Sequence, residues 1–89
     1  MKARKIGIIM KKNKIRDNIL ISLQRIGYRV YVIPEDKDVK EIFKKMEVDM
    51  VILGECDSGS ASSLMEYLRT LKSIKNVPTV VLVDKKEEN

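Results

Sequence analysis

The stretch Asp49-Met50-Val51-Ile52-Leu53 decides the fold, because it is short and almost continuously apolar. A run of this kind is typical of a strand in a parallel sheet that helices cover on both faces. A loop-like stretch follows it directly, Gly54–Ser63 (Gly-Glu-Cys-Asp-Ser-Gly-Ser-Ala-Ser-Ser). A strand buried in this way needs strands beside it and helices above and below, so the flanking sequence should contain both patterns.

Three further segments predict strands on either side of this one. The run Ile6–Met10 is apolar, and the run Tyr28–Ile33 is rich in aromatic and β-branched residues and precedes a proline. The run Thr79–Val83 comes after Asn76-Val77-Pro78, which interrupts the preceding helical pattern. Together with the stretch that contains Val51, these runs predict four strands.

The segments between the strands carry apolar residues at the spacing of amphipathic helices. The three sets are Ile15, Ile19, Leu23 and Ile26; Val39, Ile42, Phe43 and Met46; and Leu64, Tyr67, Leu68, Leu71 and Ile74. Asn13 is suited to cap the first helix and Gly27 to end it, and Asp36 or Asp38 is suited to cap the second. The predicted order of elements is therefore βαβαβαβ.

This order predicts an α/β fold in three layers, with a parallel sheet of about four strands between helices. The 89 residues suffice for one domain, which we assign to residues 1–84, and residues 85–89 form a polar tail. No apolar run reaches the roughly 20 residues that a membrane span needs. The short run after the basic N-terminus does not resemble a signal peptide, so we expect a cytoplasmic protein without membrane partners.

The composition disfavours an enzyme. The chain has no histidine and one cysteine, Cys56, which excludes a Ser-His or Cys-His nucleophile, an internal disulfide and a zinc site built on thiolates. We expect no catalytic residue, no cofactor and no metal. The net charge of +5 comes from cations spread along the chain with acids between them, and aromatic residues make up only 4%. Direct nucleic-acid binding is therefore disfavoured.

Three of the strand segments resemble those of response-regulator receiver domains, which are CheY-like members of the flavodoxin-like folds. These segments are Lys5–Lys11, Val48–Gly54 (Val-Asp-Met-Val-Ile-Leu-Gly) and Val77–Val83 (Val-Pro-Thr-Val-Val-Leu-Val). The resemblance implies the strand order 2-1-3-4 and a truncated receiver-like fold, without a counterpart of the family's fifth strand. It also implies a place in two-component signal transduction.

The resemblance further implies where phosphorylation chemistry would lie. The phosphoacceptor aspartate falls at Gly54, the acidic pair that holds Mg²⁺ falls at Met10 and Lys11, and the Thr or Ser switch falls at Val83. None of these residues has the required carboxylate or hydroxyl, so the resemblance implies a pseudo-receiver that is not phosphorylated. Divergent receivers of this kind occur at the N-termini of transcription activators, including those that act with the alternative sigma factor 54.

The expected function is a regulatory module in transcription that acts through protein–protein contacts. An apolar edge strand has to be covered, so the candidate interface comprises Tyr67 and Leu71 of the third helix with Thr79 and Val81 of the last strand. A second copy of the chain in a homodimer, or another domain of a longer chain, would cover it.

Two other functions stay open. One is a small anion- or nucleotide-binding protein that uses the Gly54–Ser63 loop and the basic cluster Lys11, Lys12, Lys14 and Arg16. The other is a fragment or minor subunit of an α/β enzyme whose chemistry lies elsewhere. A thermal-shift screen with nucleotides and phosphate analogues would test the first of these.

Overall fold

The computed structural model describes residues 4–34, 39–56, 61–72, 74 and 76–82. Within them, strands and helices alternate as the sequence predicts. The elements are β1 (Lys5–Ile9), α1 (Lys14–Ile26), β2 (Arg29–Val32), α2 (Val39–Lys45), β3 (Met50–Leu53), α3 (Ala61–Arg69) and β4 (Thr79–Val81). The predicted caps Asp36 and Asp38 and the switch position Val83 lie outside the described residues.

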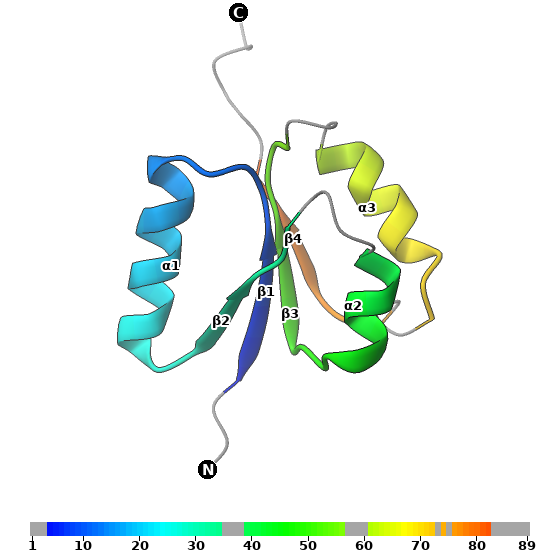
Figure 1. The fold of residues 1–89 in the computed structure, drawn as a ribbon, viewed down its shortest axis with the longest axis horizontal. Helices are drawn as coiled ribbons and strands as arrows, with labels where there is room; N and C mark the ends of the chain where they lie inside the picture. Colours follow the sequence, from blue (N-terminus) through cyan, green and yellow to red (C-terminus); the bar gives the residue numbers. More distant parts are fainter. Residues whose placement is uncertain (1–3, 35–38, 57–60, 73, 75, 83–89) are drawn as a thin grey trace, which may run out of the picture.

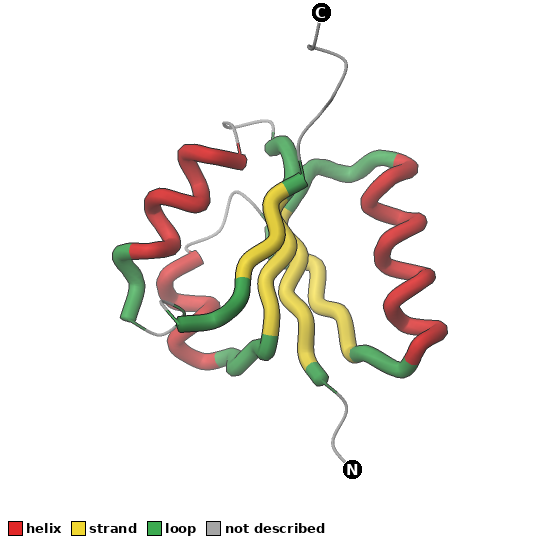
Figure 2. The backbone as a smooth tube through the Cα atoms, turned by 180° about the vertical axis from the view of Figure 1, so that it is seen from behind, coloured by secondary structure: helices red, strands yellow, loops and turns green. Residues whose placement is uncertain are grey.

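The four strands form one parallel sheet in the order β2-β1-β3-β4 (Figure 1). Strand β1 lies in the interior, where Ile8 pairs with Val32 of β2 and with Ile52 of β3. Helix α1 covers one face of the sheet, and α2 and α3 cover the other, as the reverse view in Figure 2 also shows. The predicted three-layer α/β fold and its strand order are confirmed.

Helices cover the two faces of the sheet unequally. The face under α2 and α3 carries the larger core, formed by Ile9, Ile33, Val39, Phe43, Val48, Val51, Leu53, Leu68, Leu71 and Ile74. The face under α1 carries a smaller core, formed by Ile6, Ile8, Met10 and Ile52. Successive side chains of a strand point to opposite faces, which is why Ile8 and Ile9 belong to different cores. Helix α1 itself contains no fully buried residue.

Both predicted ends of α1 are confirmed. The side chain of Asn13 accepts a hydrogen bond from the N–H of Arg16 at 2.8 Å, which satisfies one of the open donors of the first turn. Gly27 ends the helix in the left-handed conformation, with φ of 117°, and its N–H points back to the carbonyls of Leu23 and Gln24. Glycine suits this position because it has no β-carbon to strain.

Helix α3 ends earlier than the apolar spacing predicts. The pattern over Leu64–Ile74 predicts one continuous helix, but the helix ends at Arg69. Beyond it, the N–H groups of Leu71 and Ile74 donate to the carbonyls of Leu68 and Leu71, three residues back. A three-residue spacing of apolar side chains suits such tight turns as well as it suits an α-helix, so the sequence pattern does not distinguish the two.

Candidate functional site

Strands β1 and β3 end side by side at the carboxyl edge of the sheet, the edge at which open α/β sheets bind ligands. Their pairing continues beyond both strands. The N–H of Gly54 donates to the carbonyl of Ile9 at 2.9 Å, and the N–H of Lys11 donates to the carbonyl of Glu55 at 2.8 Å. The positions that the resemblance assigns to the phosphoacceptor and the acidic pair are therefore brought together.

Met10 packs against Gly54 at this edge. Both residues are buried, and Met10 is only 7% exposed. A β-carbon added at Gly54 would lie 2.7 Å from the β-carbon of Met10 and 2.9 Å from its sulfur and terminal carbon. These separations are well below the optimum for non-bonded atoms. An apolar thioether thus occupies the space into which a side chain at position 54 would project.

The side chains of Met10 and Lys11 are poorly suited to hold a hard cation. Mg²⁺ takes oxygen ligands, and neither Met10 nor Lys11 supplies one from its side chain. In the part of the chain that the structure describes, no three acidic or cysteine side chains lie close enough together to bind a metal ion. At positions 10 and 54, the structure shows an apolar contact.

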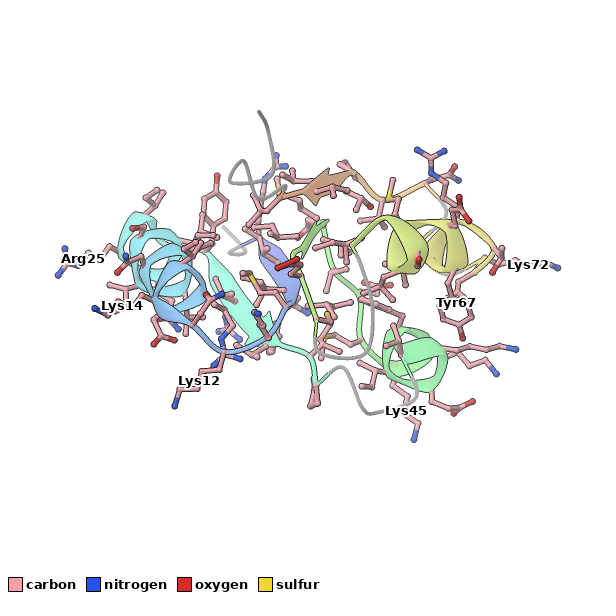
Figure 3. All side chains as sticks on the ribbon, turned by 90° about the horizontal axis from the view of Figure 1, so that it is seen from above. Lys12, Lys14, Arg25, Lys45, Tyr67 and Lys72 are labelled. Carbon is pink, nitrogen blue, oxygen red and sulfur yellow. The ribbon has the colours of Figure 1, made fainter. Side chains whose placement is uncertain are left out.

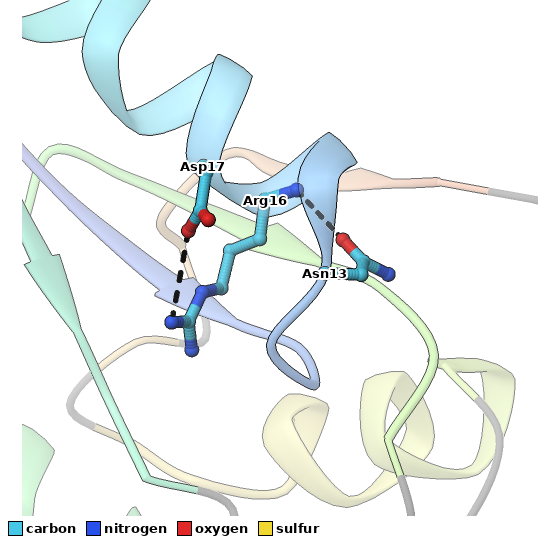
Figure 4. Close-up of polar contacts among 3 residues, drawn as sticks. All are labelled: Asn13, Arg16 and Asp17. Carbon is cyan, nitrogen blue, oxygen red and sulfur yellow. Dashed lines mark hydrogen bonds and ion pairs between the residues drawn. The ribbon is translucent and has the colours of Figure 1, made fainter.

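Arg16 is partly enclosed, as is Lys11, whereas Lys12 and Lys14 of the same basic cluster are exposed. Its guanidinium lies 3.9 Å from a carboxylate oxygen of Asp17, and its backbone N–H bonds to Asn13 (Figure 4). Only 17% of the Arg16 side chain is exposed, and its Nε is buried without a hydrogen-bond partner in the part of the chain that the structure describes. Lys12 and Lys14 instead extend into solvent (Figure 3). The predicted cluster therefore does not converge on one point.

The Gly54–Ser63 loop is described only at its two ends, because residues 57–60 lie outside the described residues. At its start, Cys56 is partly buried, and its sulfur lies 3.7 Å from the carbonyl oxygen of Gly54. The last residues of the loop, 61–63, belong to α3.

No helix within the described ranges is long and apolar enough to cross a lipid bilayer.

The predicted interface residues of α3 and β4 differ in exposure. Tyr67 is 45% exposed, whereas Leu71 is 7% exposed and belongs to the larger core. Thr79 and Val81 are partly buried, and Val81 packs against the same core. The exposed side chain of β4 is that of Val80, which faces the α1 side at 43% exposure. Of the four predicted residues, Tyr67 offers the largest side-chain surface to a partner.

The outward backbone groups of β4 belong to Thr79 and Val81. The carbonyl of Pro78 and the N–H of Leu82 both bond to β3, over 3.0 and 2.8 Å. Because backbone groups of successive residues in a strand point to opposite sides, those of Thr79 and Val81 point away from β3. No strand lies beyond β4 among the described residues. This edge can therefore pair with another strand.

A groove of about 700 Å³ lies between α2 and the end of α3. Its lining comprises Lys40, Lys44, Tyr67, Thr70, Leu71 and Lys72. Figure 3 shows Tyr67 pointing from α3 toward α2, with Lys72 extending outward beside it. Tyr67 and Leu71 were predicted from the sequence as interface residues, but the three lysines were not. The i, i+4 spacing of Lys40 and Lys44 could have predicted that these two lysines share one face of α2.

No protein-family model and no curated protein matches the sequence. Two response regulators are among the solved structures that resemble the fold. A chemotaxis response regulator, CheY4, of Vibrio cholerae matches with a TM-score of 0.77 at 15% identity, over 98% of this chain and 76% of that chain. A response regulator protein from Burkholderia multivorans matches with a TM-score of 0.64 at 22% identity, over 98% of this chain and 70% of that one. The chain has the CheY-like, flavodoxin-type α/β fold of these response regulators.

Proposed function

We propose that this chain is a receiver-like regulatory module that acts through protein contacts and without phosphorylation, in the control of transcription. The packing of Met10 against Gly54 carries the proposal. In the receiver resemblance, the end of the third strand holds the carboxylate that accepts a phosphoryl group. Here a glycine stands at that position, and the methionine beside it fills the space that a side chain would need.

The neighbouring residues support the same proposal. A phosphorylated carboxylate needs a cation to offset its charge, and a hard cation needs oxygen ligands. Met10 contributes a thioether at the first acidic position, and Lys11 contributes an ammonium group at the second. The lysine charge stands where a metal charge would otherwise be expected. Regulation by this module then depends on which partner it contacts.

The open edge of the sheet supports a docking function. The backbone groups of Thr79 and Val81 point away from β3, and Val80 exposes 43% of its surface beside them. Two copies of the chain can pair their β4 strands about a two-fold axis. The two sheets would then form one continuous sheet, and the β4 edge of each copy would be covered. We propose such a homodimer, or the docking of another protein domain, as the functional state.

The phosphorylation part of the proposal is tested with ¹⁵N–¹H amide spectra recorded with Mg²⁺ and beryllofluoride, which mimics a phosphoryl group on a carboxylate. We expect the spectra to stay unchanged, because position 54 has no carboxylate. Shifts of the amides around Lys11 and Gly54 would contradict the proposal.

The self-association part is tested by sedimentation equilibrium from micromolar to millimolar concentration. A mass that rises from that of the 10.3 kDa chain toward twice that value supports pairing at β4. A constant monomer mass over the whole range contradicts the homodimer. In that case, another protein domain would have to occupy the edge.

A second candidate function, the binding of a small anion or nucleotide, is favoured by one observation. Among the described residues, the Nε of Arg16 is buried without a hydrogen-bond partner near the carboxyl edge of the sheet, and a phosphate oxygen would accept a hydrogen bond from its N–H. A thermal-shift screen with ATP and inorganic phosphate tests this candidate. A stabilisation that Arg16→Met abolishes and Lys14→Met preserves would favour it, and no stabilisation by either ligand would exclude it.

A further inference from the structure

The α2–α3 groove, whose six lining residues are given above, combines an apolar floor with positive charge at its rim. Leu71 belongs to the larger core, and Tyr67 adds a ring that is 45% exposed. Lys40 and Lys44 approach from α2, and Lys72 approaches from the turn after α3. All three lysines are exposed, and none of the six lining residues is acidic.

Backbone hydrogen bonds hold the shape of this groove. The hydroxyl of Thr70 donates to the carbonyl of Tyr67 at 2.6 Å, and the N–H of Thr70 donates to the same carbonyl at 3.0 Å. The N–H of Leu71 donates to the carbonyl of Leu68, also at 3.0 Å. These bonds fix the turn that carries Leu71 and Lys72 against the end of α3. The wall of the groove formed by residues 67–72 is therefore ordered by the chain's own hydrogen bonds.

Among the described residues, the acidic side chain of Glu41 lies beside the rim. Its carboxylate is 3.4 Å from Nζ of Lys44, and the two side chains are 53% and 56% exposed. An ion pair this exposed contributes little, because water and salt screen it. A carboxylate from a partner can share Lys44 or take it over from Glu41. Among the described residues at the rim, the lysines outnumber this glutamate, and Lys44 and Lys72 face solvent.

We propose that the α2–α3 groove binds an acidic segment of another protein. An apolar or aromatic side chain of that segment would lie against Tyr67 and Leu71, and its carboxylates would lie beside the three lysines. This inference rests on the docking function proposed above, and it specifies the chemistry of the partner. Charge complementarity of this kind speeds association and selects the partner.

The distribution of positive charge favours an acidic protein segment over a nucleic acid. Figure 3 shows Lys12, Lys14 and Arg25 on the α1 side of the sheet, and Lys45 and Lys72 on the α2–α3 side. The cations therefore do not follow one face or one stripe, as they do in proteins that track a phosphate backbone. A short concave groove with an apolar floor suits a side chain flanked by carboxylates.

The test uses the full chain labelled with ¹⁵N and a fluorescein-labelled peptide of sequence Glu-Glu-Leu-Phe-Glu-Glu. We expect saturable binding that salt weakens, with amide shifts confined to α2 and to residues 67–72. The matched peptide Lys-Lys-Leu-Phe-Lys-Lys should not bind. Shifts centred on α1 would overturn the assignment to this groove, as would equal binding of the two peptides.

Charge-reversal variants locate the site. Lys44→Glu and Lys72→Glu should each weaken binding of the acidic peptide by about tenfold, because attraction becomes repulsion. The matched variant Lys14→Glu makes the same change on the α1 side, and it should keep the affinity within about twofold because screening limits long-range effects. Circular dichroism verifies that each variant is folded. Equal weakening in all three variants would overturn the inference in favour of non-specific attraction.

Three further readouts distinguish a failure of this inference from a failure of the proposed function. An oligo-dT strand that displaces the peptide would overturn the inference in favour of a nucleic acid. If the chain self-associates at β4 but does not bind the acidic peptide, the inference that the groove binds an acidic segment is wrong. The proposed docking function would still hold. A response to beryllofluoride would overturn the proposed function, whether or not the peptide binds.

Discussion

The β-carbon of Met10 lies only 2.7 Å from the point where a β-carbon on Gly54 would stand. The two residues follow paired parallel strands, and both lie on the α1 side of the sheet, to which Ile8 and Ile52 also contribute. Each position therefore limits the other, because this placement of methionine at position 10 requires glycine at position 54. Neither position carries a carboxylate, and the residues that stand there depend on each other through this one contact.

Adding one methyl group at this contact should destabilise the fold. We expect Gly54→Ala to lower the free energy of unfolding by about 1–3 kcal/mol, the usual effect of overpacking a core. The new β-carbon meets the β-carbon of Met10, which cannot move away without the backbone. Urea denaturation followed by circular dichroism measures the change.

Gly7→Ala is the matched control for that prediction. Gly7 is also buried in the sheet, but a β-carbon there would meet first the terminal carbon of Ile33, at 3.0 Å. The end of a flexible side chain can shift, so this variant should lose much less stability than Gly54→Ala. Similar losses in the two variants would show that the contact with Met10 is not the cause.

Introducing a carboxylate at position 54 should not by itself allow phosphorylation. We expect Gly54→Asp to stay unmodified after incubation with acetyl phosphate and Mg²⁺, because Met10 and Lys11 offer the cation no oxygen ligand. The variant should also be less stable than Gly54→Ala, since its carboxylate enters a buried apolar site. Intact-mass spectrometry reports the modification. A phosphorylated fraction would count against the role assigned to Met10 and Lys11.

Helix α1 should depend on its cap. Asn13→Ala removes the acceptor of the 2.8 Å bond from the N–H of Arg16, and we expect a loss of about 1 kcal/mol in the free energy of unfolding. Asn13→Asp keeps an acceptor and adds a favourable charge at the helix N-terminus, so its stability should equal or exceed that of the parent. If both variants lose the same stability, the hydrogen bond is not what matters at this position.

Pairing at β4 should be sensitive to a charge on Val80. Val80→Lys places an ammonium group beside the open edge, which is how natural proteins prevent strand pairing. We expect the variant to stay monomeric in sedimentation equilibrium at concentrations where the parent self-associates. Val32→Lys is the matched control, because Val32 lies on the opposite edge strand with 39% exposure. If only the Val32 variant dissociates, the interface lies at β2.

The fold could be predicted because its signals are local. The apolar run through Val51 indicates a strand covered on both faces, and Asn13 and Gly27 mark the two ends of α1 by their own backbone chemistry. The end of α3 could not be predicted in the same way. Leu71 and Ile74 keep an apolar spacing that fits either a helix or successive tight turns, and backbone bonds decide between them.

The candidate site was less accessible to sequence reasoning, because it depends on register and on pairs of elements. Met10 and Gly54 are 44 residues apart by their sequence numbers, and only the alignment of β1 with β3 brings them into contact. The lysine rim likewise combines Lys40 and Lys44 with Lys72 from a later turn. The resemblance to receivers identified the first pair of positions, but it did not predict that one side chain fills the place of the other.

Helix α1 rests on the smaller of the two cores and contains no fully buried residue. In native-state hydrogen exchange, its amides should therefore exchange through local opening, at free energies well below that of global unfolding. The amides of β1 and β3, whose side chains fill both cores, should exchange only when the whole domain unfolds. In this picture, the sheet unfolds cooperatively, whereas α1 can open locally while the sheet stays folded. A ligand that binds across α1 and β2 would therefore slow amide exchange in α1 first.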